Sequence, residues 1–136
     1  MALEISSTLL ARLLNEAEKT PDREVCGLLF GSPTRILGSL SCRNVAPDPR
    51  IAFEIDPAQL IAAHRAERKG GPKIVGCYHS HPGGPPLPSA RDAAAAMPDG
   101  SIWLIMAGRG TGIYRATENG TIEGRFVAVR HEMVEL

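Results

Sequence analysis

The stretch that decides how this chain is built reads KIVGCYHSHPGGPPLPSARD, residues 73–92. Its first six residues form a short, mostly apolar segment with β-branched side chains, which predicts a buried strand that ends at the first histidine. Successive side chains of a strand alternate faces, so we expect His79 and His81 on one face and Ser80 on the other. Two imidazoles placed in this way can converge on one metal ion.

The prolines and glycines of residues 82–88 cannot continue a helix or a strand ladder, so they predict a loop. Ser89 is a good N-cap for a helix over residues 90–97, and Asp92 falls in the first turn of that helix. The loop therefore folds a carboxylate back toward the histidines. A catalytic zinc site typically has three protein ligands, such as two imidazoles and one carboxylate, and a fourth position that is open to water or substrate. Taken alone, Ser89 and Asp92 also fit a simple helix cap.

This spacing resembles the signature of the JAMM (MPN-plus) family of zinc metalloproteases: His-Ser-His-Pro at residues 79–82, then Ser89, then Asp92. The family also needs an upstream glutamate, and Glu24 lies in the similar segment PDREVCGLLFG, residues 21–31. The chain is most similar to the short, stand-alone prokaryotic members. The resemblance implies one α/β domain over residues 1–136, with a curved, mixed, mostly antiparallel sheet flanked by helices, as in cytidine deaminases. Deaminase chemistry itself is disfavoured, because the His-x-Glu and Pro-Cys-x-x-Cys patterns are missing.

The site that we expect has one Zn²⁺ held by His79, His81 and Asp92, with a water in the fourth position. The resemblance makes Glu24 the base that takes a proton from this water and returns it to the departing amine. Ser89 is expected to donate a hydrogen bond to the oxyanion of the tetrahedral intermediate. On residue chemistry alone Glu24 is an ordinary strand-end charge, and Glu54 is a competing candidate for the base.

The resemblance implies hydrolysis of a peptide or isopeptide bond at the C-terminus of a ubiquitin-like protein, including the small sulfur carriers whose tails end in Gly-Gly. An extended tail can bind by pairing with an edge strand beside the zinc. The chain has little room for the insertions that grip ubiquitin chains, which favours sulfur-carrier conjugates. The carrier, the leaving group and the oligomeric state stay open, a homodimer included.

Three alternatives also stay open. A two-His, one-carboxylate iron oxygenase uses the same ligand types. A cupin uses His-x-His as well, but it needs a glutamate a few residues later, where this chain has GGPP at residues 83–86. A non-catalytic scaffold of the same fold usually lacks at least one ligand, and here all are present.

Composition disfavours several other classes. Lys plus Arg and Asp plus Glu number 15 each and only 4% of residues are aromatic, so nothing indicates a nucleic-acid or membrane partner. No apolar run has the length of a membrane span and the N-terminus lacks a signal-peptide pattern, so we expect a cytoplasmic protein. The cysteines, Cys26, Cys42 and Cys77, have no paired spacing and are predicted to be buried free thiols, with Cys77 near the metal site.

Hydrophobic periodicity and turn residues predict the other elements. Neither His64, on a helix, nor His131, in a charged tail, is expected to bind metal. A strand is predicted at 3–5, followed by a helix capped by Ser6 or Ser7 that ends before Pro21. Antiparallel strands are predicted at 25–30 and 35–45, then a brief strand at 53–55 and a helix to residue 70 with Asp56 as N-cap and Gln59 in a capping box. The last predicted elements are a strand at 102–107, a hairpin turn at 108–112, and strands at 113–116 and 121–129 around a turn at 118–120.

Overall fold

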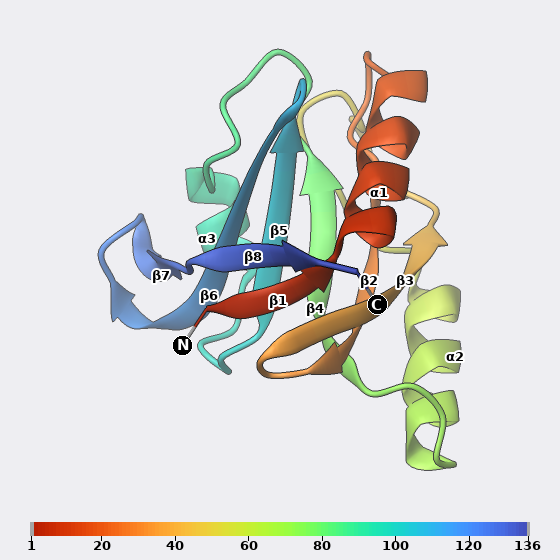
Figure 1. The fold of residues 1–136 in the computed structure, drawn as a ribbon. Helices are drawn as coiled ribbons and strands as arrows, with labels where there is room; N and C mark the ends of the chain where they lie inside the picture. The colour runs from red at the N-terminus through yellow and green to blue at the C-terminus, as the bar shows by residue number, and fades with distance from the viewer. Residues whose placement is uncertain (1, 136) are drawn as a thin grey trace.

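The computed structural model describes residues 2–135, which form three helices and eight strands. All eight strands belong to one sheet, in the order β7-β6-β5-β4-β2-β3-β1-β8 (Figure 1). The elements in chain order are β1 (Leu3–Ser6), α1 (Ser7–Lys19), β2 (Cys26–Ser32), β3 (Arg35–Cys42), α2 (Pro57–Arg68), β4 (Ile74–Ser80), α3 (Ala90–Ala95), β5 (Ile102–Ala107), β6 (Gly110–Gly120), β7 (Gly124–Ala128) and β8 (His131–Val134).

The sheet is mixed and mostly antiparallel. Strand β2 pairs antiparallel with β3 and β4, and β6 pairs antiparallel with β5 and β7. The parallel pairs are β1 with β3, β1 with β8, and β4 with β5. The sheet curls so far that β1 and β8 cross in front of β4 and β5 in Figure 1. The predicted fold class is therefore confirmed.

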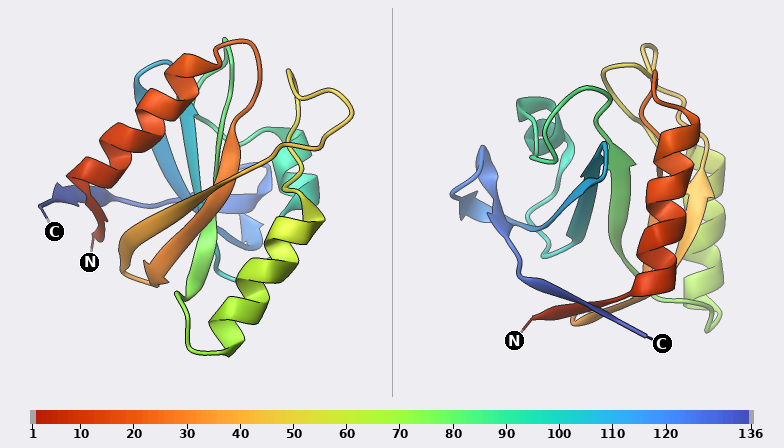
Figure 2. Two further views of the ribbon diagram at one scale, coloured as in Figure 1. Left: turned by 90° about the vertical axis from the view of Figure 1, so that its right-hand side faces the viewer. Right: turned by 45° about the horizontal axis from the view of Figure 1, so that its top comes forward.

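Helix α1 covers one face of the sheet, and α2 and α3 cover the other (Figure 2). Leu9, Leu10 and Leu13 form the buried stripe of α1, as the sequence spacing predicts. Burying one such side chain contributes about 1.5–3 kcal/mol. On the opposite face, Trp103 packs in the cluster beside α3 and Leu28 in the cluster beside α2.

Strand β4 lies in the middle of the sheet, and two glycines let it pack closely against its neighbours. A Cβ at Gly76 would lie 1.8 Å from the carbonyl oxygen of Ile102 on β5. A Cβ at Gly27 on β2 would lie 2.5 Å from the ring of Tyr78, whose hydroxyl donates to Glu16 Oε1 on α1 at 2.8 Å. The strand that carries the first histidine is thus held on both sides.

Several local predictions were wrong. Residues 53–55 form no strand, only an isolated bridge between Asn44 and Ile55. Gln59 completes no capping box, because its Oε1 accepts from Arg43 N at 2.6 Å, although Asp56 does cap α2. Strand β3 ends three residues early and α3 two residues early. Strand β6 runs through the predicted turn at 118–120, and the chain reverses at 121–123.

Strand β8 was not predicted, and His131 lies in it rather than in an irregular tail. This strand pairs parallel with β1, at the opposite end of the chain. Its side chains are half-buried or exposed, so they show little of the apolar pattern that reveals a strand.

None of the helices in the described part of the chain is long and apolar enough to cross a membrane. Cys26 and Cys42 are buried free thiols, as predicted, and Cys77 is free but only partly buried.

Candidate metal centre

His79 lies near the end of β4 and His81 directly follows the strand, and their Nε2 atoms are 3.0 Å apart. His79 is fully buried on the face that Cys77 also occupies, and His81 is partly exposed. His81 Nδ1 lies 3.1 Å from the carbonyl oxygen of Pro85. Since a carbonyl only accepts, Nδ1 carries a proton, which leaves Nε2 as the atom that can bind a metal ion once its own proton is lost. The loop at 82–88 thereby sets the tautomer of His81.

Asp92 approaches both imidazoles from α3, with its carboxylate 3.2 Å from each Nε2. Ser89 caps this helix: its Oγ accepts from Asp92 N at 3.0 Å, and its own N donates to Asp92 Oδ2 at 2.9 Å. The predicted N-cap and the predicted return of the carboxylate are both confirmed. A hydroxyl oxygen that accepts one bond can still donate its own proton, so the cap leaves the Ser89 hydroxyl able to act on a substrate.

Glu24 reaches the same point from the residues before β2. It is buried, and one carboxylate oxygen lies within 4.8 Å of ring nitrogens of both His79 and His81. Its Oε1 atom has no hydrogen-bond partner among residues 2–135. Burial raises the pKa of this carboxyl to about 7, the range suited to a general base at neutral pH. Glu54, the competing candidate, is exposed and lies outside this group.

The ionisable groups of the cluster have shifted pKa values. Burial lowers the pKa of His79, which favours the neutral imidazole that ligates metals. Burial acts against the charged carboxylate of Asp92, but hydrogen bonds from both imidazoles outweigh it and hold this pKa well below its usual range. Burial likewise opposes protonation of His81, but the bonds to Asp92 and to Pro85 prevail and raise its pKa.

These donors fit a metal cation. Imidazole and carboxylate lone pairs converge within about 3 Å of one another, an arrangement that is repulsive unless a cation or a proton lies between them. Glu24 adds a buried oxygen with no partner in the described part of the chain. The residues that could hold the ion are His79, His81 and Asp92, with Glu24 beside them.

Phe53 and Trp103 hold the ring of His79. Phe53 stacks on it with centroids 4.3 Å apart, and Trp103 meets it edge-on at 5.8 Å. Such contacts fix the orientation of a ligand. Sequence reasoning missed Phe53 as a site residue and missed the carbonyl of Pro85, since neither belongs to a motif that points to the histidines.

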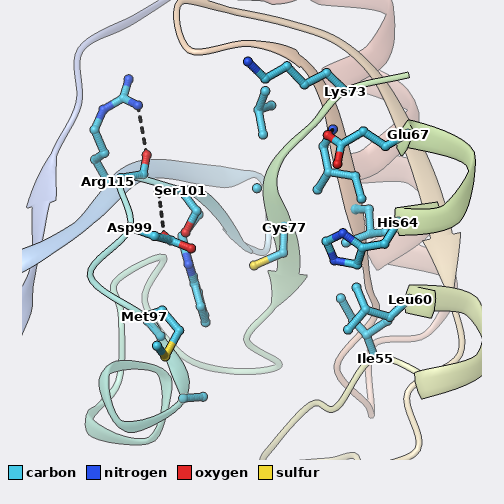
Figure 3. Close-up of a pocket in the computed structure, with 18 of the residues that line it drawn as sticks. Ile55, Leu60, His64, Glu67, Lys73, Cys77, Met97, Asp99, Ser101 and Arg115 are labelled. Carbon is cyan, nitrogen blue, oxygen red and sulfur yellow. Dashed lines mark hydrogen bonds between the residues drawn. The ribbon is translucent and has the colours of Figure 1, made fainter. Parts of the chain in front are cut away.

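A cavity of about 720 Å³ extends from Phe53 along the same face of β4. Figure 3 shows Leu60 and His64 of α2 on one side of it and Met97 on the other, with Cys77 on the strand between them. Cys77 is therefore a wall residue of this cavity and lies outside the group of converging donors. His64 is exposed on α2 and lies outside that group as well.

The profile of the family described as prokaryotic homologs of the JAB domain matches residues 6–120. The chain belongs to this family. This membership confirms the resemblance to the JAMM metalloproteases. The chain is also 36% identical to the desampylase of Haloferax volcanii over 107 residues, 77% of each chain.

Further relatives agree with this assignment. A protein named probable TtuB-protein conjugate cleaving protease, from Thermus thermophilus, is 40% identical over 86 residues, which cover 63% of this chain and 55% of that one. A JAB1/MPN domain protein from Archaeoglobus fulgidus has the same fold, with a TM-score of 0.60 at 20% identity over 96% of this chain and 98% of that one. A Desulfitobacterium hafniense protein superposes with a TM-score of 0.81 at 22% identity, over 98% and 94% of the two chains.

Proposed function

We propose that this chain is a zinc-dependent isopeptidase that hydrolyses the amide bond after the C-terminal Gly-Gly of a ubiquitin-like or sulfur-carrier protein. The observation that carries the proposal is the convergence of Glu24, a buried carboxylate without a partner among residues 2–135, on His79 and His81. The names of the relatives, desampylase and conjugate cleaving protease, support a protein conjugate as the substrate.

The proposed ligands of the zinc are His79, His81 and Asp92. Nitrogen and oxygen donors of this kind suit a catalytic zinc site with one open position. A Zn²⁺ ion bound there would lower the pKa of a water to ~7 and polarise the scissile carbonyl. Because both imidazoles lie 3.2 Å from it, the pKa of the Asp92 carboxyl is held well below its usual range, so the group is ionised and can bind a cation at neutral pH.

In the proposed mechanism, Glu24 moves the proton. Its carboxylate accepts a proton from the attacking water and then gives it to the nitrogen of the departing amine. A pKa of about 7 suits both steps, because the group is neither too weak a base nor too weak an acid. The Ser89 hydroxyl, at the start of α3, donates a hydrogen bond to the oxyanion of the tetrahedral intermediate.

The experiment that tests the proposal uses a Gly-Gly-terminated sulfur-carrier protein with a fluorogenic aminocoumarin amide at its C-terminus. The zinc-loaded wild type should release the fluorophore, and a chelator should stop the release. Glu24→Gln should bind zinc and fold as the wild type does while kcat falls by ~10²–10⁴-fold, since it keeps the size of the side chain and loses the base.

Glu54→Gln is the matched comparison, because it makes the same chemical change at the competing glutamate. Loss of activity in Glu54→Gln with normal turnover in Glu24→Gln would show that the base is misassigned. A wild type that binds the carrier without zinc and never cleaves it would favour the scaffold alternative. Activity with Fe²⁺ and oxygen but not with zinc would favour an oxygenase.

A further inference from the structure

The side-chain amide of Asn44 makes four hydrogen bonds. Its Nδ2 donates to the carbonyl oxygens of Glu24 and Ala52, at 3.0 Å each. Its Oδ1 accepts from the backbone N–H groups of Ala46 and Glu54, also at 3.0 Å. An amide has two N–H donors and two acceptor lone pairs, so all of its bonding capacity is used. Asn44 therefore has one defined orientation.

These bonds tie Glu24 to the segment that follows β3. Besides the bond from Asn44 to the carbonyl oxygen of Glu24, the N–H of Glu24 donates to the carbonyl oxygen of Pro49 at 2.7 Å. Both backbone polar groups of Glu24 are thus held by residues 44–49. The Oε1 atom of Glu24 has no hydrogen-bond partner among residues 2–135. The position of the carboxylate therefore depends on how its backbone is held.

The same amide also positions Phe53. Ala52 and Glu54, the two neighbours of Phe53, each bond to Asn44 through the backbone. Phe53 in turn stacks on His79. One side chain thus connects the backbone of Glu24 with the aromatic ring that packs against a proposed zinc ligand.

Ser80, the residue between the two histidines, also holds the backbone next to Glu24. Ser80 Oγ accepts from Val25 N at 2.9 Å, and Ser80 N donates to the carbonyl oxygen of Val25 at 3.1 Å. Glu24 directly precedes Val25 in the chain. The backbone at residues 24 and 25 is therefore hydrogen-bonded to Ser80 of β4 through Val25, and to Asn44 through Glu24.

We infer that Asn44 is a positioning residue for the proposed isopeptidase reaction, which holds the backbone of Glu24 in place relative to Phe53 and His79. The inference rests on the proposed function, because it assumes that Glu24 is the base. Asn44 acts through Glu24 and need not touch the substrate. A displacement of about 1 Å in a catalytic group can cost ~10²-fold in rate, so loss of the hydrogen bonds of Asn44 should lower kcat.

Asn44→Asp tests the inference, because it keeps the size and the acceptor atoms and removes both N–H donors. We expect kcat on the aminocoumarin substrate to fall by ~10–100-fold. The KM and the zinc content should stay within about 3-fold of the wild-type values, as expected for an interaction used mainly in the transition state. Gln59→Ala is the matched control: it removes a side-chain bond to the N–H of Arg43, next to Asn44, and leaves Glu24 untouched.

A double variant separates positioning of Glu24 from a general structural role. In the Glu24→Gln background, Asn44→Asp should cost little further rate, because the group that Asn44 positions no longer acts as a base. Independent, multiplying losses would overturn the inference. If Asn44→Asp does not fold at the assay temperature, Asn44→Ser, which keeps one donor, is measured in the same way with the same expectation.

The outcomes distinguish the two proposals. Normal turnover in Glu24→Gln overturns the assignment of the base, and the inference with it. A steep loss in Glu24→Gln combined with a kcat for Asn44→Asp equal to that of Gln59→Ala overturns only the role of Asn44. An inactive wild type overturns both.

Discussion

Phe53 lies nearly parallel to His79, with ring centroids 4.3 Å apart and an angle of 22° between the planes. His79 is fully buried, and its Nδ1 atom has no hydrogen-bond partner among residues 2–135. On the Nδ1 side the ring is therefore held by packing alone, which makes Phe53 a determinant of how well the site binds its ion.

We predict that Phe53→Ala weakens zinc binding by ~10–100-fold, the usual effect of losing a contact that orients a metal ligand. Competition with a fluorescent chelator measures this affinity. Met97→Ala is the control, because Met97 also borders the neighbouring cavity but is 68% exposed. Equal zinc affinity in the two variants would contradict the role given to Phe53.

His79→Ala and Asp92→Ala should each lose most of the bound zinc. Each removes a donor from a three-ligand set, and Asp92→Ala also removes the acidic partner of both imidazoles. Elemental analysis of the purified variants measures the metal content per chain. His64→Ala removes an exposed histidine of α2 and should keep the wild-type content. Full zinc in both site variants would rule out the ligand set.

In the metal-free protein, the contribution of Glu24 to stability should fall as the pH rises from about 4.5 to about 7. Burial raises the folded-state pKa of this group to about 7, so unfolding releases a proton in this range. At higher pH the penalty reaches about 3 kcal/mol. Glu24→Gln removes the penalty, so with a chelator present its Tm should exceed that of the wild type near pH 8 and approach it near pH 4.

Thermal melting across this pH range tests the prediction. The difference between variant and wild type isolates the contribution of Glu24, since the other ionisable groups are common to both. Glu54→Gln changes an exposed carboxylate in the same way and serves as the control. A Tm difference for Glu24→Gln that does not vary with pH would mean that burial of the carboxylate has no effect on stability.

Substitution of Ser89 should separate its cap from its hydroxyl. Ser89→Ala removes both and should cost ~1 kcal/mol of stability, whereas Ser89→Gly should cost only a few tenths, because glycine is tolerated at an N-cap. If the hydroxyl binds the oxyanion, the two variants should lose kcat equally, by ~10²–10³-fold. Melting and steady-state kinetics measure the two effects. If kcat instead falls more in Ser89→Ala than in Ser89→Gly, as the stability does, then Ser89 acts only as a helix cap.

Much of the site lies within one short stretch and could be read from it. The alternation of side chains along a strand brings His79 and His81 to one face, and Ser89 starts α3 so that its first turn presents Asp92. Both rules act over a few residues and depend little on the rest of the fold. The buried stripe of α1 and strand β5 were predicted for the same reason.

The family resemblance favoured Glu24 over Glu54, but residue chemistry along the sequence did not, and the tertiary structure supplied the physical distinction. Both glutamates lie beside apolar residues in the sequence, and neither has a local pattern that marks a base. Glu24 is the one beside the histidines because Cys26 of β2 pairs with His79 of β4, which brings together residues more than fifty positions apart. Burial at that point then raises its pKa.

The sequence by itself therefore determined the pair of histidines, the returning carboxylate and the helix cap, because backbone geometry over a few residues decides them. The folded structure decided the partners that these groups find. The stacking of Phe53 on His79, the four bonds of Asn44 and the pairing of β8 with β1 all join segments that are separate in sequence. Such contacts depend on how the whole sheet curls, and no local pattern encodes them.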